Sequence, residues 1–220
     1  MTVKIGVVSP MIAILPMIAE AFEAAWPQAK SINLVDEALY DRFAEFGDAN
    51  SPEIVTRLTR LFELSASSGV QAIAFTGSAF GEAVRRARKD IPLQVLTSFE
   101  AMIDEALTLG GKLHTLTTAQ VSLDLITQEL RDAARARGRA CVLDGAVVEG
   151  AFEALHMHSD GARHDQMIVE AIAAAPAEDV VLVGQYSMGR AARLAGGARP
   201  VLAPALSMVK AMRRRFEGGA

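Results

Sequence analysis

Two short segments, 108 residues apart, carry the side chains best suited to chemistry. Each follows an apolar run, AIAF in the first segment and VVLV in the second, that is typical of a buried parallel strand. The polar and small residues that come next are Thr76, Gly77 and Ser78 in the first segment and Gln185, Tyr186 and Ser187 in the second. Hydroxyls, an amide and the free N–H groups of a helix start can together hold a carboxylate or an oxyanion. Because open α/β sheets bind ligands at this end of their strands, we predict a ligand-binding turn in each half.

The first strand of each half ends in a second group of candidates. Ser9 and Pro10 follow the strand expected at 3–8, and Thr117 and Thr118 follow the strand expected at 112–116. We expect these four residues to line the same site as the two turns. Asp36 and Asp144 recur at the same spacing, and we expect each of them to hold the turn after the second strand of its half.

The elements that must position these residues repeat along the whole chain. Lys4-Ile5 is matched by Lys112-Leu113 at the spacing of 108, and strand-like and helix-like segments alternate throughout. Strands are expected at 3–8, 31–35, 71–75 and 93–96, and again at 112–116, 140–143, 179–183 and 200–202. We predict an α/β fold of two pseudo-symmetric Rossmann-like lobes with parallel sheets, 1–97 and 98–204. The C-terminal helix, within 205–220, is expected to pack back on the first lobe, and 147–158 is expected to be a short helical insertion.

Composition limits the classes of function. With 220 residues, 51% of them hydrophobic, the chain can bury a large core. A formal net charge of −4 gives no electrostatic footprint for nucleic acid, and the basic run 213–215 is interpreted as a charged helix end. The single cysteine, Cys141, rules out an internal disulfide and is expected to be buried in a strand. No signal peptide or membrane span is recognised, so we expect a cytoplasmic protein.

Histidine is concentrated between residues 156 and 164. His156, His158 and His164 lie close to Asp160, but their spacing matches no strong zinc pattern, so we predict no metal site. His164 and Asp165 are expected to open the following helix. Alternatively, His164 lines the ligand site and supplies a base.

The two halves, with FTGSAFGEAV in the first and VGQYSMGRAA in the second, resemble the aspartate/glutamate/hydantoin racemase superfamily, to which arylmalonate decarboxylase also belongs. Further matching stretches are SPMIAILPMIAEAF, NLVDEAL, VLTSFEAMIDEAL and HDQMIVEA. The resemblance implies an active site in the cleft between two Rossmann-like lobes, with no metal or pyridoxal phosphate. It also implies two cysteines on opposite faces of the substrate's α-carbon, because inversion requires a base on one face and an acid on the other.

The chain departs from that pattern at both cysteine positions, which fall on Gly77 and Gln185. Glycine has no side chain, and the amide of glutamine is not a proton-transfer base near neutral pH. Arylmalonate decarboxylase is similar in having glycine at the first position, but it keeps a cysteine at the second as its proton donor. Tyr186 is the most acidic side chain of the two turns and could protonate an enolate if its pKa were lowered; the alternative is a structural aromatic residue.

The resemblance implies a cofactor-independent racemase-type enzyme that acts at the α-carbon of a small carboxylate, such as an amino acid or a hydantoin. Two alternatives stay open. One is a lyase like arylmalonate decarboxylase, and the other is a carboxylate-binding relative without turnover or a chain with an engineered change at Gly77. We expect no cofactor, no nucleic-acid or membrane partner, and a homo-oligomer, by default a dimer.

Overall fold

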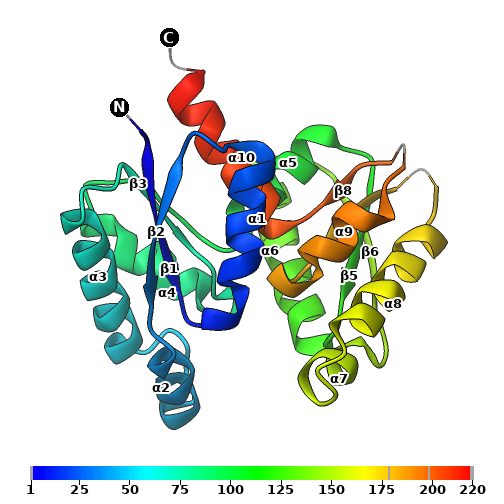
Figure 1. Ribbon diagram of the computed structural model, residues 1–220, viewed down its shortest axis with the longest axis horizontal. Helices are drawn as coiled ribbons and strands as arrows, with labels where there is room; N and C mark the ends of the chain where they lie inside the picture. The colour runs from blue at the N-terminus through cyan, green and yellow to red at the C-terminus, as the bar shows by residue number, and fades with distance from the viewer. Residues whose placement is uncertain (1, 178, 198, 219–220) are drawn as a thin grey trace. The chain divides into compact units, whose positions relative to one another are not determined.

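The chain forms two four-stranded sheets in which every strand pairing is parallel. The computed structural model describes residues 2–177, 179–197 and 199–218 (Figure 1). The first sheet contains β1 (Lys4–Ser9), β2 (Lys30–Val35), β3 (Ala72–Phe75) and β4 (Val95–Leu96) in the order β2-β1-β3-β4. The second contains β5 (Lys112–Thr117), β6 (Val142–Val147), β7 (Val180–Val183) and β8 (Val201–Leu202) in the order β6-β5-β7-β8. The predicted α/β class with parallel sheets is confirmed.

Contacts divide the chain into two compact units. Unit 1 contains residues 1–101 and 208–220, and unit 2 contains residues 102–207. The last helix, α10 (Pro204–Glu217), begins in unit 2 and ends in unit 1. There the ring of Phe216 stacks on that of Trp26 with centroids 5.9 Å apart, and Arg213 Nη1 donates a hydrogen bond to the carbonyl oxygen of Ala25 at 2.9 Å. The C-terminal segment is thereby joined to the end of the first helix.

Helices connect and cover the strands of unit 1. They are η1 (Ile12–Ile14), α1 (Leu15–Ala25), α2 (Ala38–Phe46), α3 (Pro52–Ser67), η2 (Ser78–Phe80), α4 (Gly81–Ala87) and η3 (Arg88–Asp90). Figure 1 shows α1 and α3 on opposite sides of the strands. Helix α3 begins as its sequence predicts, because the hydroxyl of Ser51 accepts a hydrogen bond from the backbone N–H of Ile54 at 3.3 Å and proline occupies the first turn.

The core of unit 1 is aromatic on the α3 side of the sheet. Phe75 of β3 contacts Phe62 of α3 and Phe80 of η2 edge to face, with centroids 6.1 and 6.0 Å apart. Tyr40 and Phe43 of α2 pack on Phe80 in turn. Since Phe75 is fully buried and directly precedes the predicted ligand-binding turn, this cluster fixes the backbone of that turn.

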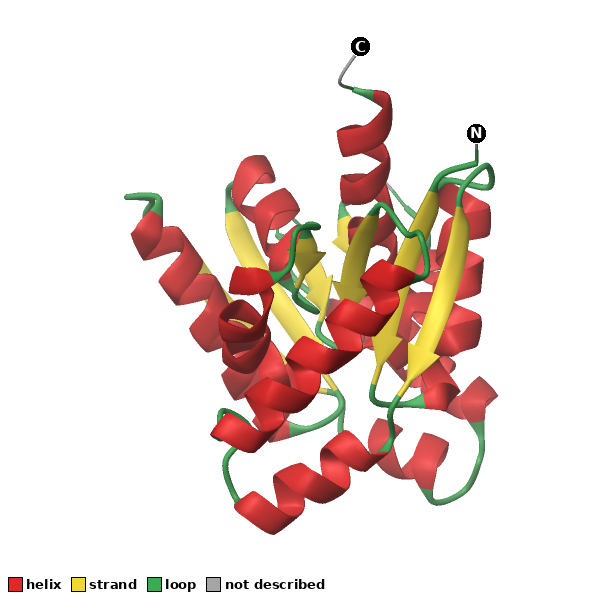
Figure 2. Ribbon diagram, turned by 90° about the vertical axis from the view of Figure 1, so that its left-hand side faces the viewer, coloured by secondary structure: helices red, strands yellow, loops and turns green. Residues whose placement is uncertain are grey.

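Unit 2 repeats this plan. Its helices are α6 (Gln120–Ala136), α7 (Ala151–His156), α8 (Gly161–Ala174), η4 (Tyr186–Met188) and α9 (Gly189–Ala195), and α5 (Glu100–Leu109) leads into it from unit 1. Asp160 caps α8 by accepting a hydrogen bond from the N–H of Arg163 at 2.9 Å. Figure 2, in which strands are yellow arrows, shows neighbouring strands pointing the same way. Among the described residues, no helix has the length and apolar character needed to cross a membrane.

The prediction that Asp36 and Asp144 occupy equivalent positions in the two units is wrong. The connection from β5 to β6 is longer than that from β1 to β2, so the second strands are offset differently from the first strands. The N–H of Asp36 donates to the carbonyl oxygen of Ser9, and the N–H of Val148 donates to that of Thr117, so Val148 is the true counterpart of Asp36. Asp144 instead lies within β6, opposite His114, with its side chain exposed.

Three further expectations change. Residues 151–156 are no insertion, because α7 follows β6 as α2 follows β2. Helix α2 itself lies in a stretch for which the sequence pattern predicts no element. Cys141 precedes β6 rather than lying within a strand; it is partly exposed, and its partial burial raises the pKa of its thiol.

Candidate functional site

The hydroxyls that end β1 and β5 stabilise their own turns. Ser9 Oγ donates to the carbonyl oxygen of Met11 at 2.8 Å and accepts from the N–H of Met11 at 3.1 Å. In unit 2, Thr117 Oγ1 donates to the carbonyl oxygen of Ala119 at 3.0 Å. Both hydroxyls are fully buried, and both shape the chain as it leaves the sheet.

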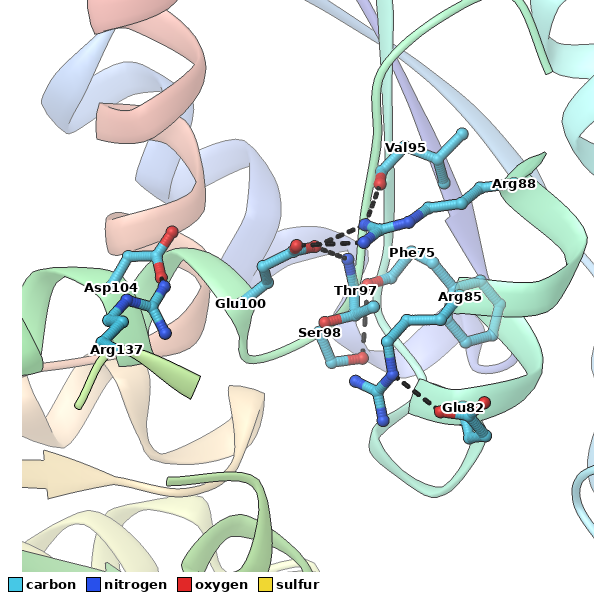
Figure 3. Close-up of polar contacts among 10 residues, drawn as sticks. All are labelled: Phe75, Glu82, Arg85, Arg88, Val95, Thr97, Ser98, Glu100, Asp104 and Arg137. Atoms are coloured by element: carbon cyan, nitrogen blue, oxygen red, sulfur yellow. Dashed lines mark hydrogen bonds and ion pairs between the residues drawn. The ribbon is translucent and has the colours of Figure 1, made fainter. Parts of the chain in front are cut away.

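Further hydroxyls follow β3 and β4, and Figure 3 shows the two that follow β4, those of Thr97 and Ser98. Ser98 Oγ donates to the carbonyl oxygen of Phe75 at 3.2 Å, which links the two strand ends. Thr76 and Thr97 are also buried, but neither hydroxyl has a hydrogen-bond partner among the residues that the structure describes. Thr76 is among the site residues predicted from the sequence, and Thr97 and Ser98 are not. Their position after β4, equivalent to that of Thr76 after β3, is the signal that could have found them.

The backbone beside Thr97 is held by an ion pair. The N–H of Thr97 donates to Glu100 Oε2 at 3.2 Å, and Arg88 donates to both carboxylate oxygens of Glu100, at 2.7 and 3.2 Å (Figure 3). Arg88 also donates to the carbonyl oxygen of Val95 at 2.8 Å. These bonds hold the end of the edge strand β4, and both carboxylate oxygens of Glu100 accept hydrogen bonds within unit 1.

Gly77 is closely surrounded by other side chains. A Cβ built on it would lie 2.7 Å from Phe75 Cε1 and 2.8 Å from Pro10 Cγ, which is closer than real contacts allow. The backbone angles, φ −92° and ψ 107°, suit any residue, so the limit is space rather than conformation. The structure therefore brings Pro10 and Gly77 together. Ser78, which begins η2, is partly exposed.

Gln185 is joined to Thr118. Its Oε1 accepts from the N–H of Thr118 at 2.6 Å and from the Thr118 hydroxyl at 2.9 Å. The amide nitrogen of Gln185 has no acceptor among the described residues. Its acceptor end is therefore engaged within unit 2, and its donor end is the part that can meet a ligand.

Proton donation by Tyr186 would require a lowered pKa, and the structure gives the opposite shift. Its side chain is buried, and this burial raises the pKa of the phenol well above its usual value. The neighbouring Ser187 is partly exposed on η4.

A buried polar cluster lies in the first turns of α8. His164 Nδ1 and Asp165 Oδ1 are 2.9 Å apart, and Arg190 of α9 donates to the other carboxylate oxygen. His164 is almost fully buried, and its Nε2 has no partner among the described residues. His164 therefore lies inside the helix rather than opening it. The described residues contain no group of three side chains that could hold a metal ion.

Asp36 links the end of β2 to α3. Its carboxylate accepts from Arg57 Nε at 2.5 Å and from Arg57 Nη2 at 2.7 Å, and this hydrogen bonding raises the pKa of Arg57. The interaction matches the structural role expected for Asp36.

A family model described as Asp/Glu/Hydantoin racemase matches residues 5–212. The chain belongs to this racemase family. Comparison with curated protein sequences gives no match.

Three solved structures illustrate the fold of this racemase family. Allantoin racemase from Klebsiella pneumoniae is 18% identical with a TM-score of 0.72, and the match covers 99% of this chain and 89% of that one. Aspartate racemase from Picrophilus torridus is 11% identical with a TM-score of 0.69, covering 98% and 94%. Unliganded arylmalonate decarboxylase is 20% identical with a TM-score of 0.54, covering 100% and 95%. At these identities the likeness establishes the shared fold.

Proposed function

We propose that this racemase-family chain is a cofactor-independent enzyme that acts at the α-carbon of a small carboxylate. The hydroxyl of Thr76 carries the proposal, because it is buried at the end of β3 without a partner among the described residues. Leaving such a group unpaired costs about 1–3 kcal/mol. A ligand carboxylate would accept this hydrogen bond, and in the reaction the same hydroxyl would stabilise the developing enolate.

The two-thiol route implied by the family resemblance is not available to this chain. Gly77 has no side chain and no space for one, and the oxygen of Gln185 is bound to Thr118. A different group must therefore carry the proton.

His164 is our candidate for that group. A carboxylate that accepts the Nδ1 proton fixes the neutral tautomer in which Nε2 holds the lone pair, which is the form a general base requires. Asp165 is placed to do this at 2.9 Å, and Arg190 holds the other oxygen of the carboxylate. Nε2 is buried and has no partner among the described residues, so no other hydrogen bond there competes for its lone pair.

A second candidate function is a carboxy-lyase that acts on malonate-type diacids. It is favoured by the packing at Gly77, where Phe75 and Pro10 occupy the space of one acid or base. Racemisation needs proton transfer at both faces of the α-carbon. Loss of carbon dioxide leaves an enediolate that needs a proton from one face only.

Proton NMR in deuterium oxide tests the proposal with a panel of amino acids, hydantoins and malonates. Loss of the α-hydrogen signal with inversion supports a racemase, and carbon dioxide release from a malonate supports the lyase. Absence of both, with retained binding, would show a carboxylate-binding relative without turnover. His164→Gln should lower the rate at least about 100-fold, while the matched control His158→Gln, at an exposed histidine, should leave it unchanged.

A further inference from the structure

A separate cavity opens between the end of α2 and the start of α3. It has a volume of about 360 Å³, within the range of about 300–1,000 Å³ typical of small-molecule sites. Its apolar lining includes Phe46, Pro52 and Ile54, and Phe46 is 39% exposed. None of its lining residues belongs to the turns after β1, β3, β5 or β7.

The polar lining of this α2–α3 cavity is predominantly cationic. Arg42, Arg57 and Arg60 line it together with one carboxylate, that of Glu53. Asp36 and Glu45, which lie outside the lining, pair with Arg57 and Arg42, so the cavity offers guanidinium donors rather than a net positive charge. One carboxylate is too few for a metal site, whereas arginine forks suit oxyanions.

The arginines keep donors available for a ligand. Asp36 binds Nε and Nη2 of Arg57, which orients the guanidinium and leaves its Nη1 without an acceptor among the described residues. Arg42 uses Nη1 to contact Glu45 on the exposed surface. Arg60 is exposed and has no partner in the described part of the chain.

We propose that the α2–α3 cavity binds a phosphate monoester that carries a flat aromatic ring, such as a nucleoside monophosphate. A phosphate monoester presents three acceptor oxygens, which can meet the remaining donors of Arg57 and Arg60 together, whereas a monocarboxylate presents two. The exposed face of Phe46 provides a stacking surface for the ring, an interaction that tolerates any base. Arg57, held in place by Asp36, and Arg60, one turn further along α3, bind the phosphate.

Isothermal titration calorimetry of the full chain with adenosine 5′-monophosphate tests this site. We expect a Kd below about 1 mM at low salt, and weaker binding as salt screens the arginines. Adenosine lacks the phosphate and inorganic phosphate lacks the aromatic ring, so each should bind at least about tenfold more weakly than the monophosphate. Equal binding of adenosine, or no binding of the monophosphate up to about 10 mM, would overturn the proposal.

Two variants and a matched control locate the binding. Arg60→Gln should weaken it about tenfold, and Phe46→Leu, which keeps an apolar side chain but loses the ring, at least about fivefold. Arg131→Gln, at an exposed arginine of α6, should leave it unchanged. Amide shifts in two-dimensional NMR should fall within residues 42–60; shifts centred on 76–78 or 185–187 would contradict the proposed site.

Discussion

Gln185 Oε1 accepts two hydrogen bonds from Thr118, one from its backbone N–H at 2.6 Å and one from its hydroxyl at 2.9 Å. This pair joins the turn after β7 to the turn after β5 within unit 2. Gln185 therefore supports the backbone beside it, which a thiol at this position, a weak acceptor, would do poorly.

Replacing Gln185 should reveal this structural role. Gln185→Ala leaves the N–H of buried Thr118 without its acceptor and should lower the free energy of unfolding by about 1–3 kcal/mol. Gln185→Glu keeps an acceptor oxygen and should retain most of the stability. Urea unfolding followed by circular dichroism measures both, and equal losses in the two variants would show that the hydrogen bonds contribute little.

Adding a methyl group at Gly77 should be destabilising for reasons of space. Gly77→Ala places a Cβ against the rings of Phe75 and Pro10 and should cost about 1–3 kcal/mol. The matched control is Gly189→Ala: its Cβ would meet nothing within 4 Å and its φ is −61°, so this change should be neutral or slightly stabilising. Similar effects of the two changes on the free energy of unfolding would contradict this packing.

The same packing governs the introduction of a thiol at position 77. Gly77→Cys should destabilise unit 1, and Phe75→Leu combined with it should recover part of the loss by opening space beside Cβ. Additive effects of the two substitutions in denaturant unfolding would show that they do not share that space.

Alkaline pH should destabilise the fold through its buried tyrosines. Burial raises the pKa of Tyr186 and of Tyr40, while an unfolded tyrosine loses its proton near pH 10. Above about pH 10 the unfolded state therefore binds fewer protons than the folded state, so the free energy of unfolding falls as pH rises; below that pH this contribution is constant. Tyr186→Phe should flatten the decline, and a slope unchanged in the Tyr40→Phe/Tyr186→Phe variant would refute the linkage.

The ion pair of Asp36 with Arg57 should couple more strongly than an exposed pair. A double-mutant cycle to alanine should give about 1 kcal/mol for this bidentate contact, whose carboxylate side chain is 11% exposed. The exposed pair of Arg42 with Glu45 should give about 0.3 kcal/mol. Equal coupling energies would mean that the burial of Asp36 adds nothing.

Local patterns predicted most of the fold. The apolar runs of β3 and β7 are short and strongly buried, and the serine cap of α3 is a local signal, so both could be identified from neighbouring residues. The position of β6 could not be identified in this way. It depends on the length of the β5–β6 connection, and a constant spacing of 108 residues between the two halves does not reveal that this connection is longer. Helix α2 carries a local signal too, because Leu39, Tyr40 and Phe43 recur at helical spacing, so it could also have been identified from neighbouring residues.

The candidate site was only partly predictable for the same reason. The types of residue in the two turns can be read from the sequence. That Phe75 and Pro10 occupy the space beside Gly77 depends on tertiary packing and cannot be read in this way. The bond between Gln185 and Thr118 likewise joins residues 67 positions apart. No spacing rule reports such contacts, nor does any rule distinguish the unpartnered hydroxyl of Thr76 from the engaged hydroxyl of Ser9.

The central proposal is tested most directly by deuterium incorporation at the α-carbon. It is measured on the best substrate of the panel for wild type, Thr76→Ser and Thr76→Val. Incorporation at the protonated carbon should occur with wild type and persist with Thr76→Ser, which keeps the hydroxyl. Thr76→Val, which has a similar shape but no donor, should lower kcat/KM about 100- to 1,000-fold. Absence of both exchange and carbon dioxide release with wild type, or full activity of Thr76→Val, would contradict it.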